Sequence, residues 1–148
     1  RVQASDYNLG VLDTLRALTT VGDVSKEDFE KVVNHWDSVK LSNGKDHVYN
    51  TIVIIQKETN TVAAVGSLVV EQKLIHASGL VGHIEDIAVR GNHQGKKLGW
   101  NLIQELIKVG KEIGVYKIIL VCDEKNVGFY EKCGLSRAGV EMSIRFDK

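Results

Sequence analysis

The sequence contains no proline, only two cysteines and no excess of charge of either sign. Average proline usage is about 5%, but its absence points to no function. Cys122 and Cys133 lie eleven positions apart, which fits neither a dense disulfide framework nor a CxxC pair, so we expect reduced thiols and a cytoplasmic location. Because 19 basic residues balance 19 acidic ones, no overall field attracts a polyanion, and we expect no nucleic-acid partner.

Long apolar runs are also missing. The longest, such as 118–122, are far shorter than the roughly 20 residues of a membrane span, and the N-terminus shows no signal-peptide pattern. With 43% hydrophobic and 26% charged residues, disorder is disfavoured. The length of 148 residues suits a single domain over 1–148. Charge is nevertheless uneven, because residues 91–148 hold ten basic and seven acidic side chains.

Hydrophobic periodicity predicts both helices and strands. The helices expected from the spacing of apolar residues are 7–19, one that begins at Ser25 and passes Trp36, 98–113 and 124–132. The expected strands are 51–56 and 62–70, which form a hairpin, then 80–90, the buried segment 116–122, and 140–146. The order strand, helix, strand over 80–122 implies a right-handed crossover between parallel strands.

Glu85 and Asp86 interrupt the alternation of the strand 80–90. Neighbouring residues of a regular strand face opposite sides, so only a bulge would bring both carboxylates to one cleft. The sequence therefore predicts a bulge here, although a charge pair at a strand edge is the alternative.

The loop 92–99, Asn-His-Gln-Gly-Lys-Lys-Leu-Gly, leads from this strand into the next helix. Backbone N–H groups at a helix N-terminus, together with Lys96 and Lys97, suit a phosphate. The loop lacks the Gly-Lys-Ser/Thr ending of a Walker A motif and is not a GxGxxG motif. On the local sequence alone, a phosphate cradle and a solvated turn are equally favoured.

These segments together resemble the GNAT superfamily of acyl-CoA-dependent N-acyltransferases. The segments that carry the resemblance are 84–89, 94–99, the strand after the helix, and 126–135. A closer similarity, to the eukaryotic glucosamine 6-phosphate N-acetyltransferases, is carried by 18–22, 82–89, 116–120, 124–127, 129–134 and 139–142. The resemblance covers nearly the whole chain and implies an α/β (α+β) GNAT fold, a central mixed twisted sheet with helices on both faces and a βαβ acetyl-CoA-binding core.

The resemblance also implies where acetyl-CoA binds. Its pantetheine arm would pair with the strand at Ile87, a backbone N–H near Ile87 would polarise the thioester carbonyl, and the loop up to Trp100 would take the pyrophosphate. Tyr130 would lie near the thioester sulfur, where a phenol can protonate a departing thiolate; without the resemblance, a Tyr packed beside Phe129 is favoured. The implied acetyl-CoA-binding residues are Ile87, Ala88, Val89, Gln94, Gly95, Lys96, Lys97, Leu98, Gly99, Trp100, Asn126 and Tyr130.

For the acceptor, the resemblance implies contacts of Glu85 and Asp86 with the amino sugar, with a carboxylate orienting the amine or accepting its proton through water. The implied substrate-binding residues are Thr19, Lys73, Leu74, Ile75, His76, Glu85, Asp86, Tyr116, Lys117 and Arg145. Lysine and arginine suit a sugar phosphate. In the family such distant residues meet in an intertwined homodimer, in which the final strand region crosses toward the partner.

Two positions depart from the family pattern: Lys97 stands where a glycine is expected, and Val121 stands where an acidic residue usually precedes the cysteine. The leading hypothesis is transfer of an acetyl group from acetyl-CoA to D-glucosamine 6-phosphate by direct attack in a ternary complex, without a metal, in UDP-N-acetylglucosamine biosynthesis. The catalytic residues would be Tyr130, Glu85, Asp86 and Ile87. The alternatives are a protein amine or polyamine as acceptor, and a CoA-binding module without catalysis.

The remaining histidines and Cys122 favour structural interpretations. His35, His47 and His93 lie in polar stretches and are expected to be solvated. His83 and Glu85 could supply two metal ligands, but no third residue has the spacing of a metal ligand, so we expect no metal. A strand cysteine without an adjacent histidine is more often a small hydrophobe than a nucleophile.

Overall fold

The structure is a computed structural model that describes residues 1–93, 95 and 97–147. Its helices and strands, in chain order, are the 3₁₀-helix η1 (Ala4–Leu9), α1 (Val11–Leu15), α2 (Lys26–Ser38), β1 (Tyr49–Gln56), β2 (Thr61–Gln72), α3 (Ile75–Ser78), β3 (Leu80–Val89), η2 (Gly91–His93), α4 (Leu98–Ile113), β4 (Lys117–Ile119), η3 (Glu124–Asn126) and α5 (Val127–Lys132).

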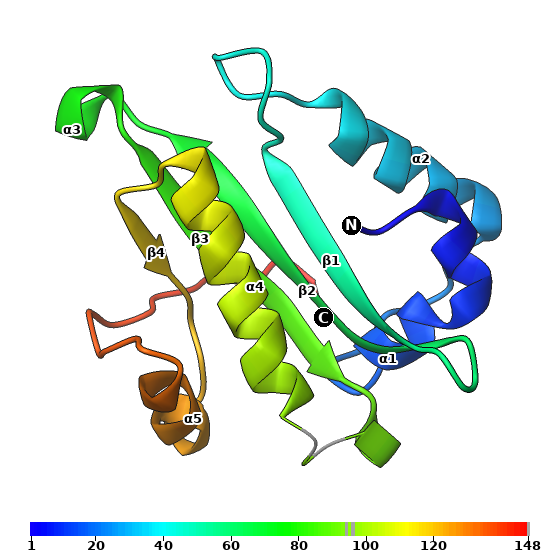
Figure 1. Cartoon of the computed structure of the whole chain (residues 1–148). Coiled ribbons are helices and arrows are strands. Elements are labelled where there is room, and N and C mark those ends of the chain that lie inside the picture. Colours follow the sequence, from blue (N-terminus) through cyan, green and yellow to red (C-terminus); the bar gives the residue numbers. More distant parts are fainter. Residues whose placement is uncertain (94, 96, 148) are drawn as a thin grey trace.

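The strands form one mixed sheet in the order β1-β2-β3-β4 (Figure 1). β1 and β2 are an antiparallel hairpin, and β2 and β3 are also antiparallel. β4 is parallel to β3 and follows it through α4. The predicted hairpin and the predicted parallel pair joined by a helix are therefore confirmed.

Helices cover both faces of the sheet. On one face, α4 lies across β2 and β3 (Figure 1) and buries Leu102, Ile103 and Leu106 completely against β2 side chains such as Leu68. On the other face, α1 and α2 pack against a second apolar cluster that includes Val65 of β2. Burial of each such Leu or Ile contributes about 1.5–3 kcal/mol to stability, so the two helical layers hold the sheet, including β3, firmly between them.

Local signals place two helices where the sequence predicts them. Ser25 caps α2, since its hydroxyl oxygen accepts a bond from the Asp28 N–H at 3.0 Å. The predicted helix 98–113 is confirmed in full, and Gly114 ends it in a left-handed conformation with φ of 96°. Such a residue lets the chain leave a helix without a Cβ clash.

The prediction of one continuous helix over 7–19 is wrong. Gly10 has a φ of 87° and separates η1 from α1, which ends at Leu15. A Cβ on Gly10 would lie 2.5 Å from Nη2 of Arg90, whose guanidinium donates to the Gly10 carbonyl at 2.9 Å. The left-handed glycine breaks the helix, and a residue 80 positions away bonds to the chain at this break.

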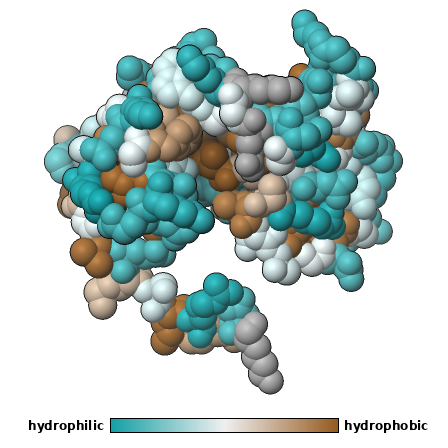
Figure 2. Space-filling model, turned by 90° about the horizontal axis from the view of Figure 1, so that it is seen from below, coloured by the Kyte–Doolittle hydropathy of each residue, from teal (hydrophilic) through white to brown (hydrophobic). Residues whose placement is uncertain are grey.

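The two C-terminal strand predictions need correction. Of the segment 116–122, only Lys117–Ile119 pairs, and it is partly exposed because β4 is an edge strand. The segment 140–146 is not a strand, because the tail leaves the body of the chain (Figure 2) and has no neighbouring strand there. Its alternating apolar side chains are 78–93% exposed: Val140, Met142, Ile144 and Phe146.

Both cysteines are free thiols, Cys133 being buried and Cys122 partly buried. No helix within the described part of the chain combines the length and apolarity that a bilayer span needs.

Candidate active site

The strand β3 carries the bulge that the sequence predicts. Val65 pairs with Ala88 and Ser67 pairs with Glu85, so two β3 residues face the single β2 residue between these pairs. Asp86 is one of the two, and its φ of 53° is left-handed. Glu85 and Asp86 are both exposed and line the same cavity. The bulge thus brings two adjacent carboxylates to one cleft, as expected.

The cavity has a volume of about 320 Å³ and opens where β3 and β4 separate. The two strands are paired at only three positions, from Val81–Lys117 to His83–Ile119, and the chain then turns away into η3 and α5. Viewed from below, the molecule shows a hollow between two lobes with apolar residues on its floor (Figure 2). The cavity is lined by Leu18, Ile84, Glu85, Asp86, Ile87, Leu120, Val121, Cys122, Asp123, Asn126, Tyr130 and Glu141.

Tyr130 reaches this cavity from α5, opposite the bulge. Its ring lies edge-on to Phe129, with ring centroids 5.0 Å apart, and packs against the core on the α4 side. Burial raises the pKa of Tyr130 above its usual value, and Cys122 and Cys133 raise it further. A raised pKa keeps the phenol protonated at neutral pH, so Tyr130 is suited to donate a proton or a hydrogen bond.

The loop between β3 and α4 turns through left-handed residues. Gly95 has a φ of 86° and Lys97 a φ of 59°. Lys97 adopts here the backbone conformation that usually favours glycine. Gln94 and Lys96, which the sequence predicts as acetyl-CoA-binding residues, lie outside the described residues. His93 is 4% exposed, so its predicted solvation is wrong.

The N-terminus of α4 has the features of an anion site. Lys97 is its cap residue and makes no capping bond with its side chain, and the first turn contains no acidic residue. The helix therefore presents N–H groups that Lys97 does not cap, and its dipole favours negative charge there. Leu98 and Gly99 are half-buried, whereas Trp100 is exposed. Because Asn126 lies in the cavity and Ile87, Ala88 and Val89 lead to this loop, an extended ligand could run along the end of β3.

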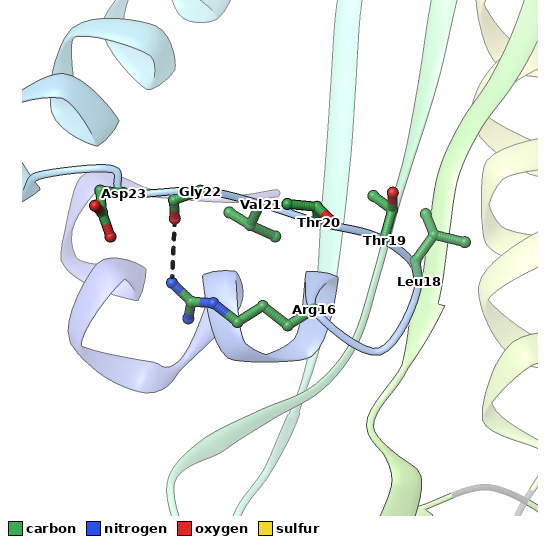
Figure 3. A pocket seen from close by; sticks show the side chains of 7 residues that line it. All are labelled: Arg16, Leu18, Thr19, Thr20, Val21, Gly22 and Asp23. Atoms are coloured by element: carbon green, nitrogen blue, oxygen red, sulfur yellow. Dashed lines mark hydrogen bonds between the residues drawn. The ribbon is translucent and has the colours of Figure 1, made fainter. Parts of the chain in front are cut away.

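Thr19 lies in a second, more open hollow that adjoins the cavity. It is formed by Arg16 and 18–23, and Leu18 lines both spaces. Figure 3 shows Leu18 pointing toward β3, and Arg16 Nη2 donating to the Gly22 carbonyl at 3.5 Å. Arg16 also pairs with Asp13 at 2.5 Å, so its charge is partly neutralised.

Most of the cationic residues predicted for the substrate gather at the opposite end of β3. His76 of α3 stacks on Tyr116 with ring centroids 4.1 Å apart, and Lys117 Nζ lies 5.9 Å from the Tyr116 ring centre. Lys73 pairs with Glu71 at 3.0 Å. His76, Ala77 and Ser78 are all left-handed. We call Lys73, Leu74, Ile75, His76, Tyr116 and Lys117 the distal group.

Distance separates the distal group from the bulge within one chain. Six residues run from Leu80, which begins β3 beside this group, to Asp86, and a strand rises about 3.3 Å per residue, giving roughly 20 Å. Arg145, on the exposed tail, pairs instead with Asp147 at 2.7 Å. The structure therefore places Glu85, Asp86, Ile87, Asn126 and Tyr130 around one cavity, but not the distal group or Arg145.

Sequence reasoning missed several residues that line the cavity. Leu18, Asp123 and Glu141 come from three separate segments. Leu18 and Glu141 lie in the segments 18–22 and 139–142 that carry the family resemblance, whereas Asp123 lies four positions after the end of β4 and had no such signal. Asp123 supplies a carboxylate to the cavity two positions after Val121.

Residues 14–135 match the model of the Acetyltransferase (GNAT) family. The chain belongs to the GNAT family. The glucosamine 6-phosphate N-acetyltransferase of Candida albicans is 49% identical over 146 residues, covering 99% of this chain and 93% of that protein. The enzyme of the same name from Arabidopsis thaliana is 38% identical over 148 residues, covering 99% of this chain and 95% of that protein.

Comparison of structures gives the same result for the fold. The crystal structure of glucosamine-6-phosphate N-acetyltransferase from Arabidopsis thaliana superposes with a TM-score of 0.91 and 35% identity, covering 99% of this chain and 96% of that chain. The predicted GNAT fold, with its mixed sheet between helices, is therefore confirmed. As a GNAT acetyltransferase, the chain uses acetyl-CoA as acyl donor, and the cavity beside the bulge of β3 and the N-terminus of α4 offers polar groups for both ends of such a donor.

Proposed function

We propose that this chain transfers the acetyl group of acetyl-CoA to the amine of D-glucosamine 6-phosphate, giving N-acetyl-D-glucosamine 6-phosphate and CoA. The observation that carries the proposal is the cavity in which the bulge of β3 places Glu85 and Asp86 with the protonated phenol of Tyr130. The names of the relatives from Candida albicans and Arabidopsis thaliana support this acceptor, because the similarity extends over 99% of this chain. The product would enter UDP-N-acetylglucosamine biosynthesis in the cytoplasm.

The acyl donor would lie along the end of β3. A chain with amide groups can add to a strand edge through main-chain hydrogen bonds. In this arrangement the thioester carbonyl accepts a bond from the Ile87 N–H, and the pyrophosphate sits at the N-terminus of α4. The residues proposed to hold the donor are therefore Ile87, Ala88 and Val89, then 94–100, and Asn126 with Tyr130.

The reaction would be a direct attack within a ternary complex. The neutral amine attacks the thioester carbon, so a C–N bond forms and the C–S bond breaks. The amine loses one proton through water to the carboxylate of Glu85 or Asp86. The departing sulfur takes a proton or a hydrogen bond from Tyr130, whose raised pKa keeps the phenol protonated beforehand.

Recognition of the phosphate would require a second copy of the chain. The distal group lies roughly 20 Å from the bulge along β3, so it cannot serve the same chain's cavity at the distance of direct contact. Leu74 is 92% exposed, and the tail exposes four alternating apolar side chains. We therefore propose a homodimer in which the tail, with Arg145, crosses to the partner and the distal group of one copy completes the cavity of the other.

The experiment is free-thiol release from acetyl-CoA with glucosamine 6-phosphate, run beside unphosphorylated glucosamine and a lysine peptide. Release that is fast only with the phosphorylated sugar supports the proposal. Release that is fastest with the lysine peptide would contradict it and indicate a protein amine as acceptor. Tight acetyl-CoA binding without release on any of the three would also contradict it and indicate a binding module.

A further inference from the structure

Gly66 of β2 lies directly opposite the bulge of β3. The neighbouring pairs Val65–Ala88 and Ser67–Glu85 leave Gly66 facing both Asp86 and Ile87. Its backbone is not among the left-handed positions of the chain, so the conformation of Gly66 does not itself require glycine. A glycine in a strand interior is unfavourable and marks a place where another group approaches closely. The structure shows which group this is.

The side chain of Ile87 occupies the space that a side chain at position 66 would need. A Cβ built on Gly66 would lie closer to Ile87 Cδ1 than real Cβ atoms come to a neighbour, and 3.0 Å from Leu102 Cδ2. Leu102 lies on the buried face of α4 and is fully buried in the core, so it has little room to withdraw. Ile87, which is half-buried, is therefore the group that would have to move.

We infer that Gly66 is a positioning residue that acts through Ile87. The empty position at 66 lets the Ile87 side chain enter the core between β2 and α4, and this anchors the bulged segment of β3. The inference deepens the proposed function and rests on it, because the Ile87 N–H is the proposed donor to the thioester carbonyl. The sizes of residues 66 and 87 are then coupled: a larger residue at 66 requires a smaller one at 87.

The test is a cycle of Gly66→Ala, Ile87→Val and the double variant. Valine lacks Cδ1, the atom that the new Cβ would meet. We expect Gly66→Ala to lower kcat roughly ten- to hundredfold at saturating substrates, because a misplacement of about 1 Å at a reacting group can cost about 100-fold in rate. The double variant should recover most of this loss and match Ile87→Val within about threefold, which is under 1 kcal/mol at 1.36 kcal/mol per tenfold.

Gly82→Ala is the matched control. A Cβ on Gly82 would meet Leu68 Cδ1 at 2.8 Å and Ile118 Cγ1 at 3.1 Å, so it creates a comparable clash on the same sheet face. Gly82 lies four residues before Asp86 in β3 and pairs with Val70 of β2, so it is outside the bulge. Gly82→Ala should lower the melting temperature but leave kcat unchanged. If Gly82→Ala lowers kcat as much as Gly66→Ala does, the effect is general to the sheet and the inference is wrong.

Wild-type turnover with glucosamine 6-phosphate is measured first, which separates this inference from the proposed function. If the wild type is inactive, the proposed function fails, and the pair is judged by amide hydrogen exchange of 84–88. Faster exchange in Gly66→Ala that the double variant reverses still supports the coupling. If the wild type is active, a normal kcat in Gly66→Ala, or no recovery in the double variant, overturns the inference. If Gly66→Ala does not fold, a double variant that folds supports the coupling and one that does not overturns it.

Discussion

Replacing Tyr130 with phenylalanine would remove one hydroxyl from the cavity and leave the aromatic ring. The ring keeps its edge-on contact with Phe129 and its packing against the core. We therefore expect the free energy of unfolding to change by less than about 1 kcal/mol. Any larger effect on turnover would then come from chemistry in the cavity.

The expected size of the kinetic effect follows from the bond that the hydroxyl would make. A hydrogen bond to a charged acceptor, such as a departing thiolate, contributes about 1.5–3 kcal/mol. At 1.36 kcal/mol per factor of ten, kcat should fall about tenfold to 150-fold. Affinity for acetyl-CoA should change little, because the bond strengthens only as the thiolate forms.

The raised pKa of Tyr130 adds a pH signature. Burial raises this pKa above its usual value of 10.0, so the phenol is almost wholly protonated at neutral pH. The ratio of wild-type to variant kcat should therefore be constant between neutral pH and about pH 9, and should fall only as the pH approaches the raised pKa. A ratio that already falls between pH 7 and 8 would place the pKa too low for this role.

The assay measures kcat by thiol release, acetyl-CoA affinity by calorimetry and melting temperature by circular dichroism. Tyr7→Phe is the control, because it also removes a phenol hydroxyl, which donates to the Val24 carbonyl at 3.2 Å outside the cavity. Tyr7→Phe should leave kcat unchanged. An unchanged kcat in a folded Tyr130→Phe enzyme would refute the assignment of Tyr130 to the leaving sulfur.

Three further predictions concern stability, assembly and pH. Thr14→Val should lower the free energy of unfolding by about 1–2 kcal/mol, because the fully buried hydroxyl of Thr14 donates to a β2 carbonyl at 2.9 Å and accepts from Arg90 at 3.1 Å. Arg90 keeps other acceptors in this variant. Chemical denaturation measures the change, and an unchanged free energy of unfolding would contradict the contact. Ending the chain after Ala138 should convert a dimer to a monomer by light scattering and abolish turnover while a thermal transition remains; an active monomer would refute the shared site. His83→Ala should raise the pKa of Glu71 toward 4.5, because the His83 bond is the largest cause of its lowering, and NMR titration tests this. In the wild type, the ionised Glu71 should stabilise the fold above pH 4.5, and this contribution should vanish as the pH falls through the lowered pKa.

The elements that the sequence predicts correctly depend on residues close to one another in the chain. Ser25 and Asp28 define the start of α2, and Gly114 ends α4. The adjacent acids Glu85 and Asp86 indicate the bulge, because two polar neighbours cannot both face one side of a regular strand. In each case a local rule about caps, left-handed residues or alternation is enough.

The failures depend on distant residues. Gly10 interrupts the predicted first helix in a left-handed conformation, and its carbonyl accepts a bond from Arg90, which no local pattern contains. The tail alternates like a strand, yet a strand needs a neighbour for its N–H and C=O groups. An alternating pattern predicts which side chains can be buried together on one face. It does not predict which segment or which chain covers that face. The tail of this protein shows that difference directly, with Phe146 91% exposed.

The bulge shows how stability and function compete at one point of the sheet. A non-glycine residue held in the left-handed region costs about 1–3 kcal/mol, although a short polar side chain such as that of Asp86 tolerates it better than most. Glycine at position 86 would remove this cost and would also remove a carboxylate from the cavity. On the neighbouring strand β2 the situation is the opposite. A residue with a side chain would stabilise the strand at position 66, but Gly66 has none, and the Ile87 side chain occupies that space. Each position thus holds a residue that local strand preference disfavours, and the two face each other at the bulge of β3, beside the cavity that Asp86, Ile87 and Tyr130 line.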